Sequence, residues 1–209
     1  TFDVMNTPAI VGVAKDNHVV TILDNTWGAG VLLKPLDLGV DISVQALTKY
    51  AVGHADNMGG AVMTKSEDLQ ARIDACSNDW GISLSPDDAY MALRGLRTLR
   101  TRLQQHEASG FAVARWLSSR PEVSQVLHPG LETHPEHDLW QRDFDGANGL
   151  FGAVLNGVDT DQLDTFLEAL ELFGMGFSWG GYESLLIPCC DQLNRLPGDR
   201  IHNRAGPLL

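Results

Sequence analysis

At 209 residues the chain is long enough for one sizeable hydrophobic core or two small ones. Hydrophobic residues make up 44% and charged residues 20%, with no apolar run of about 18 residues to cross a bilayer, so we expect a soluble globular protein outside the membrane. The formal net charge of −12 disfavours nucleic acid as a partner, because affinity for phosphates comes largely from Lys and Arg.

The cysteines and the chain ends bear on location and completeness. Cys76, Cys189 and Cys190 are odd in number and lack the spacing of a metal site, so neither a disulfide framework nor a bound metal is predicted. A reducing cytoplasm suits this cysteine usage best. The chain begins at Thr1 without a signal sequence and stops on the apolar Leu209, which leads us to expect that it belongs to a longer protein.

Three strands and two helices are predicted in the first half of the chain. The segments 18–23, 42–46 and 60–64 have the β-branched or alternating character of strands, and their spacing suits an α/β layer. Ser66 is a plausible N-cap for a helix over 66–79, and Ser85-Pro86 opens a longer helix. The apolar stripe of the longer helix consists of Leu93, Leu96, Leu99 and Leu103. On its other faces we expect solvated or interface arginines rather than a phosphate site, namely Arg94, Arg97 and Arg100.

The second half of the chain predicts a small α+β domain. Helical character continues over 111–117, and strands follow at 123–127 and 148–155. An amphipathic helix is predicted over 161–173. Its inward side chains are Leu163, Phe166, Leu170 and Phe173. We therefore predict two domains, residues 1–95 and 96–209, divided near the long helix.

The segment from Asp41 to Tyr50 carries the most chemical information. A strand there delivers the Thr48 hydroxyl and the Lys49 amine to its carboxyl end, where open α/β sheets bind ligands. Apolar neighbours would disfavour the ammonium form of Lys49 and make it a better imine-forming amine. Taken alone, a lysine after a strand is more often a surface charge.

Asp24 supplies a second group if its strand lies beside that of Lys49. A carboxylate next to a pyridine nitrogen keeps that nitrogen protonated, and the ring then accepts electrons from a substrate carbanion. Alone, Asp24 is better explained as a turn or capping residue before Asn25-Thr26. Lysine and aspartate together at strand ends are typical of a pyridoxal-phosphate (PLP) site.

Several segments, in order along nearly the whole chain, resemble the Cys/Met-metabolism PLP-dependent enzymes. They are Asp24-Asn25-Thr26-Trp27, the segment from Asp41 through Thr48-Lys49-Tyr50 to Gly53-His54, Ser85 to Tyr90 with Arg94 to Leu99, and Ser178-Trp179-Gly180-Gly181 to Leu185. The resemblance implies the latter part of a fold type I large domain, with a mainly parallel sheet, followed by a smaller α+β domain. It also implies PLP as cofactor and a homo-oligomer, arranged as a dimer of dimers.

The resemblance implies a role for five residues of this chain. Lys49 would hold PLP covalently, Asp24 would pair with its ring nitrogen, and Thr48 would donate to its phosphate. Ser178 and Trp179 would lie at the substrate, with Ser178 near its carboxylate. Trp179 most resembles the β-lyases of the family. Tyr182 and Glu183 match as well, with packing in a small-domain strand as the alternative.

The chain also departs from the family pattern. Ala46 replaces a common serine that contacts the phosphate, and Ala55 replaces the serine of a Gly-His-Ser-Asp segment. His54 and Asp56 are expected to be structural rather than catalytic. The family's early half, which carries the ring-stacking aromatic residue and a phosphate loop, has no counterpart here. Its substrate-carboxylate arginine would follow Leu209 directly.

The expected reaction is β-elimination from cystathionine, an amino-acid thioether, giving homocysteine, pyruvate and ammonia. One alternative is a γ-lyase or γ-synthase of the same family, which Trp179 disfavours. Another is a non-catalytic truncated homologue, which the absent family segments favour. Other cysteine-conjugate β-lyases also remain open.

Overall fold

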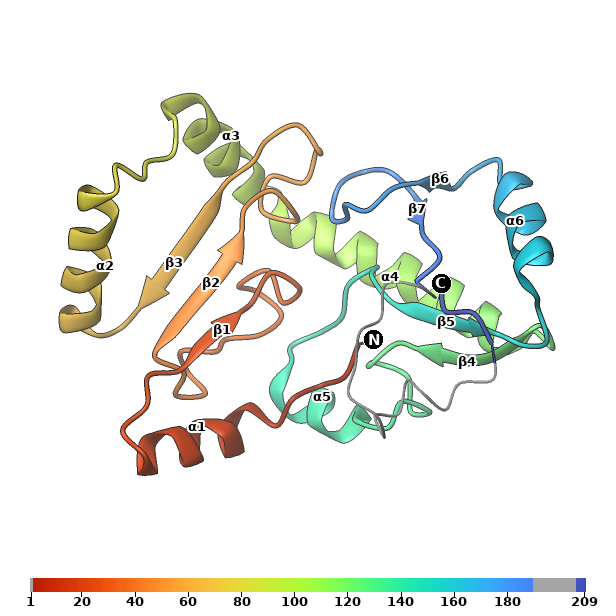
Figure 1. Ribbon diagram of the computed structural model, residues 1–209, viewed down its shortest axis with the longest axis horizontal. Helices are drawn as coiled ribbons and strands as arrows, with labels where there is room; N and C mark the ends of the chain where they lie inside the picture. The colour runs from red at the N-terminus through yellow and green to blue at the C-terminus, as the bar shows by residue number, and fades with distance from the viewer. Residues whose placement is uncertain (1, 190–205) are drawn as a thin grey trace.

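The computed structural model describes residues 2–189 and 206–209. Figure 1 shows a three-stranded sheet with α1, α2 and α3 around it, and a second group of elements, from β4 to β7, beside the far part of α4. The helices are α1 (Thr7–Asp16), α2 (Glu67–Asp79), α3 (Pro86–Leu96), α4 (Leu99–Ser118), α5 (His137–Asp143) and α6 (Thr160–Glu168). The strands are β1 (Ile22–Asp24), β2 (Ile42–Ala46), β3 (Gly60–Thr64), β4 (Val123–Leu127), β5 (Gly152–Leu155), β6 (Gly174–Met175) and β7 (Leu185–Leu186).

The three-stranded sheet has the order β1-β2-β3. β1 runs parallel to β2, with Asp24 opposite Val44, whereas β3 runs antiparallel to β2. The α/β class is confirmed, and the predicted strands 42–46 and 60–64 match β2 and β3. The first strand begins at Ile22 rather than at His18, because His18 has a positive φ of 56° and Val19 N donates to Ala14 O as α1 ends. The sequence reasoning did not predict α1.

The predicted long helix is two helices. α3 ends at Leu96 and α4 begins at Leu99, because Thr98 leaves the helical region with φ −110° and ψ 2°. The break changes which side chains face inward. Leu99 and Leu103 are 4% and 2% exposed, whereas Leu93 and Leu96 are 53% and 47% exposed. The helix predicted over 66–79 is confirmed as α2, with Ser66 Oγ accepting a hydrogen bond from Leu69 N.

The second group of elements has a two-stranded antiparallel sheet of β4 and β5, on which α4 packs. The predicted strand 123–127 is confirmed, and the next strand begins at Gly152 rather than at residue 148. α6 ends at Glu168 because the chain turns at Ala169 and enters β6, which pairs with β7. Leu163 is buried as predicted, but Phe166 and Phe173 are 40% and 38% exposed, so their predicted burial is wrong.

A buried cluster joins the two groups and supports the site described below. It consists of Ala29, Leu32, Tyr50, Leu99 and Leu103. Asn148 Nδ2 also donates to Trp27 O at 2.7 Å, and Asp145 N donates to Leu32 O at 2.8 Å. The division at residues 95 and 96 stays a prediction. Within the described ranges 2–189 and 206–209, no helix has both the length and the apolar character to span a membrane.

Candidate active site

The carboxyl ends of β1 and β2 lie at one edge of the sheet, because the two strands are parallel neighbours. Asp24 ends β1 as an exposed residue, and its Oδ1 accepts hydrogen bonds from Thr26 N at 2.9 Å and Thr26 Oγ1 at 2.6 Å. Thr26 Oγ1 in turn accepts from Ala46 N at 2.9 Å. Thr26 therefore ties the aspartate to the end of β2, an Asx-type arrangement that fixes one carboxylate oxygen. In the described part of the chain, Asp24 Oδ2 makes no hydrogen bond.

Lys49 lies on a tight turn that follows β2. Val52 N donates to Leu47 O at 3.0 Å, and Gly53 N donates to Lys49 O at 2.9 Å. Gly53 has a φ of +77°, which few residues other than glycine adopt. The three residues after the lysine, Tyr50, Ala51 and Val52, are 2%, 0% and 1% exposed. Lys49 itself is half-buried, so a buried turn presents its amine at the sheet edge.

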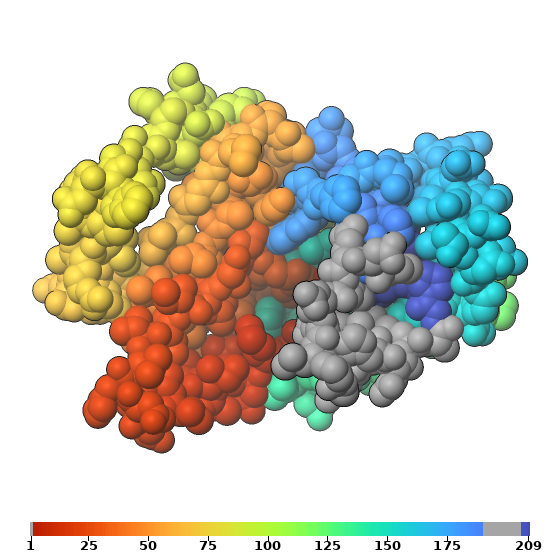
Figure 2. Space-filling model, viewed as in Figure 1, coloured from red at the N-terminus to blue at the C-terminus, as the bar shows by residue number. Residues whose placement is uncertain are grey.

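The structure brings Lys49 together with the two predicted substrate residues from the other end of the chain. Lys49 Nζ donates to Ser178 Oγ at 3.1 Å and lies 5.5 Å from the centre of the Trp179 ring. Figure 2 shows the blue segment around β6 and β7 against the orange segment that follows β2. Gly180, with φ +83°, allows this approach, because a Cβ there would lie 2.8 Å from Tyr50 N.

Aromatic rings form an apolar wall behind the amine. The Tyr50 ring meets Trp179 edge-on at 5.4 Å and His106 at 5.2 Å. Burial raises the pKa of the Tyr50 phenol well above its usual value, so the phenol stays neutral. Burial, and then the nearby Arg102 cation, lower the pKa of His106. The wall is therefore uncharged at neutral pH.

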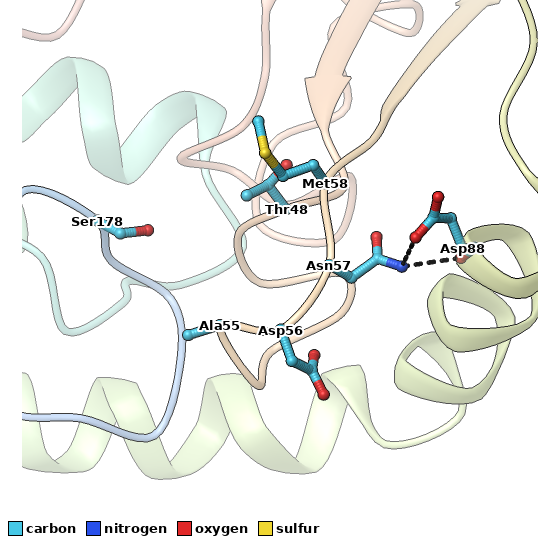
Figure 3. A pocket seen from close by; sticks show the side chains of 7 residues that line it. All are labelled: Thr48, Ala55, Asp56, Asn57, Met58, Asp88 and Ser178. Atoms are coloured by element: carbon cyan, nitrogen blue, oxygen red, sulfur yellow. Dashed lines mark hydrogen bonds between the residues drawn. The ribbon is translucent and has the colours of Figure 1, made fainter.

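Thr48 and Ser178 line an open depression of about 450 Å³. Thr48 Oγ1 accepts a hydrogen bond from Gly59 N at 3.1 Å. As a donor, Thr48 Oγ1 lies 3.4 Å from Gly59 O, which makes a weak bond, so the hydroxyl can turn to another acceptor. Figure 3 shows the rest of the lining, with Asn57 Nδ2 donating to Asp88 Oδ1 at 2.8 Å. The remaining lining residues are Ala55, Asp56 and Met58. The described lining is acidic rather than basic.

These residues fit the functional groups of PLP. Lys49 offers a primary amine for its aldehyde, Asp24 Oδ2 a carboxylate acceptor for its ring N–H, and Thr48 a hydroxyl donor for its phosphate. The fit to the phosphate is partial, because Asp56 and Asp88 carry the wrong charge for an anion.

Four further residues of the predicted motifs lie near this edge or in the 178–185 element without contacting the amine. His54 Nδ1 lies 2.8 Å from Val52 O and Asp56 lines the depression, and the structural roles predicted for both stay predictions. Tyr182 and Glu183 are exposed, Tyr182 at 79%, and they precede β7 rather than pack within a strand.

Sequence reasoning missed Arg102. Arg94, Arg97 and Arg100 are exposed as expected, whereas Arg102 Nη1 donates to Tyr50 O at 2.7 Å, directly after Lys49. Nothing in the sequence distinguishes it, because the four arginines follow one another at spacings of two or three residues.

This chain is similar to known proteins over most of its length. The family model described as Cys/Met metabolism PLP-dependent enzyme matches residues 1–205. A cystathionine beta-lyase of Bordetella avium is 44% identical over 185 residues, covering 88% of this chain and 46% of that protein. An L-alanine/L-glutamate racemase of Wolbachia pipientis wMel is 40% identical over 189 residues, covering 90% of this chain and 47% of that protein.

A solved structure is also similar to this chain. The crystal structure of cystathionine gamma synthase from Xanthomonas oryzae pv. oryzae in complex with aminoacrylate and cysteine has a TM-score of 0.83 at 36% identity, covering 86% of this chain and 46% of that one. The chain thus spans about half the length of the relatives it matches. Since the family model matches nearly all of it, the chain belongs to the Cys/Met metabolism PLP-dependent enzyme family, whose cofactor is pyridoxal phosphate.

Proposed function

We propose that the complete protein is a carbon–sulfur lyase that cleaves cystathionine by β-elimination. The observation that carries the proposal is the position of Lys49 Nζ, 3.1 Å from Ser178 Oγ and 5.5 Å from the Trp179 ring centre. This contact joins a cofactor-binding amine to the Ser-Trp-Gly-Gly element that resembles the β-lyases. The overall reaction consumes cystathionine and water and yields homocysteine, pyruvate and ammonia.

Lys49, Asp24 and Thr48 would hold PLP through its aldehyde carbon, ring nitrogen and phosphate. When bound, the cofactor supplies an electron sink for the carbanion formed at the substrate α-carbon. Asp24 would keep the ring nitrogen protonated through its carboxylate, whose direction is fixed because Thr26 holds Oδ1. The Asp24 carboxylate would thereby determine how strongly the cofactor ring accepts electrons from the substrate carbanion.

Lys49 would act as the base in the reaction. Its Nζ takes the α-proton and can pass a proton to the departing sulfur as the Cβ–S bond breaks. Ser178 Oγ, now 3.1 Å from Nζ, orients the amine and binds the substrate carboxylate. The Trp179 face stabilises the ammonium that Lys49 becomes and excludes water from it.

Product analysis tests the proposal. The complete PLP-loaded protein is given cystathionine and, in a separate reaction, L-alanine, and the products are separated by chromatography that also resolves the alanine enantiomers. β-Elimination predicts pyruvate and homocysteine in equal amounts. Dominant 2-oxobutyrate and cysteine would replace the proposal with γ-elimination, and interconversion of alanine enantiomers without pyruvate would replace it with racemisation. No reaction at all would favour a non-catalytic homologue.

We also propose a homo-oligomer, arranged as a dimer of dimers and working in the cytoplasm. Large exposed apolar side chains support an assembly, among them Trp80 at 79% and Tyr90 at 64%. Light scattering on the complete protein should give four subunits per particle, and a monomer would contradict the proposal.

A further inference from the structure

We propose that Arg102 is a positioning residue for Lys49, whose guanidinium locks the turn that carries the lysine against the junction of α3 and α4. The inference rests on the proposed function in one respect, that Lys49 is the reacting amine. Arg102 lies in the first turn of α4, and Figure 1 shows α4 passing beside the chain that leaves β2.

All three guanidinium nitrogens of Arg102 are engaged. Nη1 donates to Tyr50 O at 2.7 Å, and Nη2 donates to Ala51 O at 3.2 Å and Gly95 O at 2.8 Å. Nε donates to Thr98 Oγ1 at 3.1 Å. Hydrogen bonds from a cation are roughly twice as strong as neutral ones, and a planar fork fixes direction as well as distance. Two of these bonds end on the carbonyls directly after Lys49.

Glycines allow the backbones to meet closely around this cation. A Cβ on Gly53 would overlap the Arg102 guanidinium, and a Cβ on Gly95 would overlap Ala51 O. On the opposite side, a Cβ on Gly180 would lie 2.8 Å from Tyr50 N and 3.1 Å from the carbonyl carbon of Lys49. The turn is therefore held between the α3–α4 junction and the Ser178–Gly181 element.

The fixed turn also sets the surroundings of the amine. Tyr50, whose carbonyl accepts from Arg102, is 2% exposed and places its ring against Trp179 at 5.4 Å. Lys49 Nζ in turn lies over Trp179. Because Tyr50 is buried and cannot move alone, displacing its carbonyl moves both the lysine backbone and the aromatic wall that the amine faces.

Four variants of the complete protein, each prepared with and without PLP, test the inference: Arg102→Ala, Arg102→Lys, Arg100→Ala and Arg100→Lys. Arg100 is a matched control, since it lies two positions earlier on α4, is exposed, and makes no side-chain hydrogen bond, ion pair or ring contact with the described residues. Three properties are measured: amide hydrogen exchange over residues 50–53 without cofactor, the pH midpoint of the visible absorption of the bound cofactor, and kcat and KM.

For Arg102→Ala we expect faster amide exchange, by about tenfold or more, since exchange follows local opening. The absorption midpoint should shift by about half a pH unit or more, because the surroundings of Lys49 Nζ change. We expect kcat to fall about ten- to hundredfold, because a small displacement of an oriented catalytic group reduces the rate by about that factor. KM should stay within about threefold of the wild-type value. Arg102→Lys should recover part of each effect, since an ammonium cannot reproduce the fork. Both Arg100 variants should match the wild type.

Two results would overturn the inference. One is a folded Arg102→Ala protein that matches Arg100→Ala in all three properties. The other is faster exchange with an unchanged midpoint and kcat, which would make Arg102 structural only. If Arg102→Ala does not fold, the same three properties are compared between Arg102→Lys and Arg100→Lys, and the same two results would overturn the inference. An unexpected product from cystathionine would refute β-elimination but leave these comparisons valid, because each variant is compared on whatever reaction the protein performs.

Discussion

Thr26 shows how a single side chain prepares a site that the sequence only suggests. Thr26 donates two hydrogen bonds to Asp24 Oδ1 and accepts one from Ala46 N. The carboxylate at the end of β1 therefore has a fixed orientation. That Asp24, Thr48 and Lys49 lie at neighbouring strand ends could be predicted from the sequence, whereas their roles toward the cofactor stay predictions. The bridging role of Thr26 could not be predicted, since it depends on the register in which Asp24 lies opposite Val44.

Replacing Asp24 should slow catalysis without abolishing cofactor binding. Asp24→Asn removes a charge-assisted hydrogen bond worth about 1.5–3 kcal/mol, which corresponds to about a ten- to hundredfold loss of turnover. Steady-state kinetics of pyruvate release would measure this loss, with the exposed Asp16→Asn as a charge-matched control. Turnover of Asp24→Asn equal to that of the control would exclude Asp24 from the role.

His128 is a buried side chain with no place in the proposed chemistry. It is 0% exposed and lies between the rings of Phe111 and Phe151, at 4.6 Å and 5.5 Å. Burial lowers the pKa of His128 from 6.5 to about 4, and the neighbouring charges of His134 and Arg115 act in the same direction. Gly130 N donates to its Nδ1 at 3.1 Å, which suits the neutral ring.

The free energy of unfolding should therefore depend on pH through His128. Between pH 6.5 and about 4 the unfolded chain binds a proton that the folded protein does not, so stability falls as the pH falls through this window. The contribution is at most roughly 3 kcal/mol. Urea unfolding of wild type and His128→Asn at a series of pH values would show it, since Asn can still accept from Gly130 N. An exposed-site control is His18→Asn. An equal pH dependence in all three proteins would contradict the prediction.

Among the elements, the junction of α3 and α4 differs most from what the sequence predicts. The apolar spacing of Leu93, Leu96, Leu99 and Leu103 favours one continuous helix. The chain breaks there because Thr98 leaves the helical region and Gly95 packs on the carbonyls of Ala51 and Val52. Local strands such as β2 and β4 were predictable from alternation, whereas this break depends on a contact more than 40 residues away in sequence.

Replacing either of two helical glycines with alanine should change the stability of the protein, in opposite directions. Gly95→Ala places a Cβ against backbone oxygens and should destabilise the protein by about 1–3 kcal/mol. Gly12→Ala in α1 meets nothing within 4 Å, and helix propensity then predicts a gain of about 0.5–1 kcal/mol. The denaturant concentrations at the unfolding midpoints of both variants measure these two changes in stability. A Gly95→Ala protein as stable as Gly12→Ala would show that the α3 contact is absent in solution.

At the scale of the whole molecule, several large apolar side chains are exposed around the site. Met58, Phe177 and Tyr182 are 79%, 75% and 79% exposed, and two of them flank Ser178 in sequence. Soluble proteins rarely leave such side chains together in water unless another surface covers them. The chain spans 46–47% of the curated relatives compared with it, so the proposed activity is a property of the complete protein.

The 209-residue chain produced alone should therefore be inactive as a lyase, even if it folds. The acidic lining of the depression gives a phosphate few partners, and the chain spans only about half the length of the relatives it matches. Absorption spectra should show little bound cofactor, and pyruvate release should equal that of free PLP. Pyruvate formation well above that rate would mean that the essential groups lie within this chain.

Mapping the amine that holds the cofactor tests the central claim most directly. The complete PLP-loaded protein is reduced with borohydride, which fixes the cofactor to its lysine, and the digested peptides are sequenced by mass spectrometry. We predict the cofactor on Lys49, within the segment Thr48-Lys49-Tyr50. Its attachment to Lys15, Lys34 or Lys65 instead would contradict the assignment of this sheet edge as the active site.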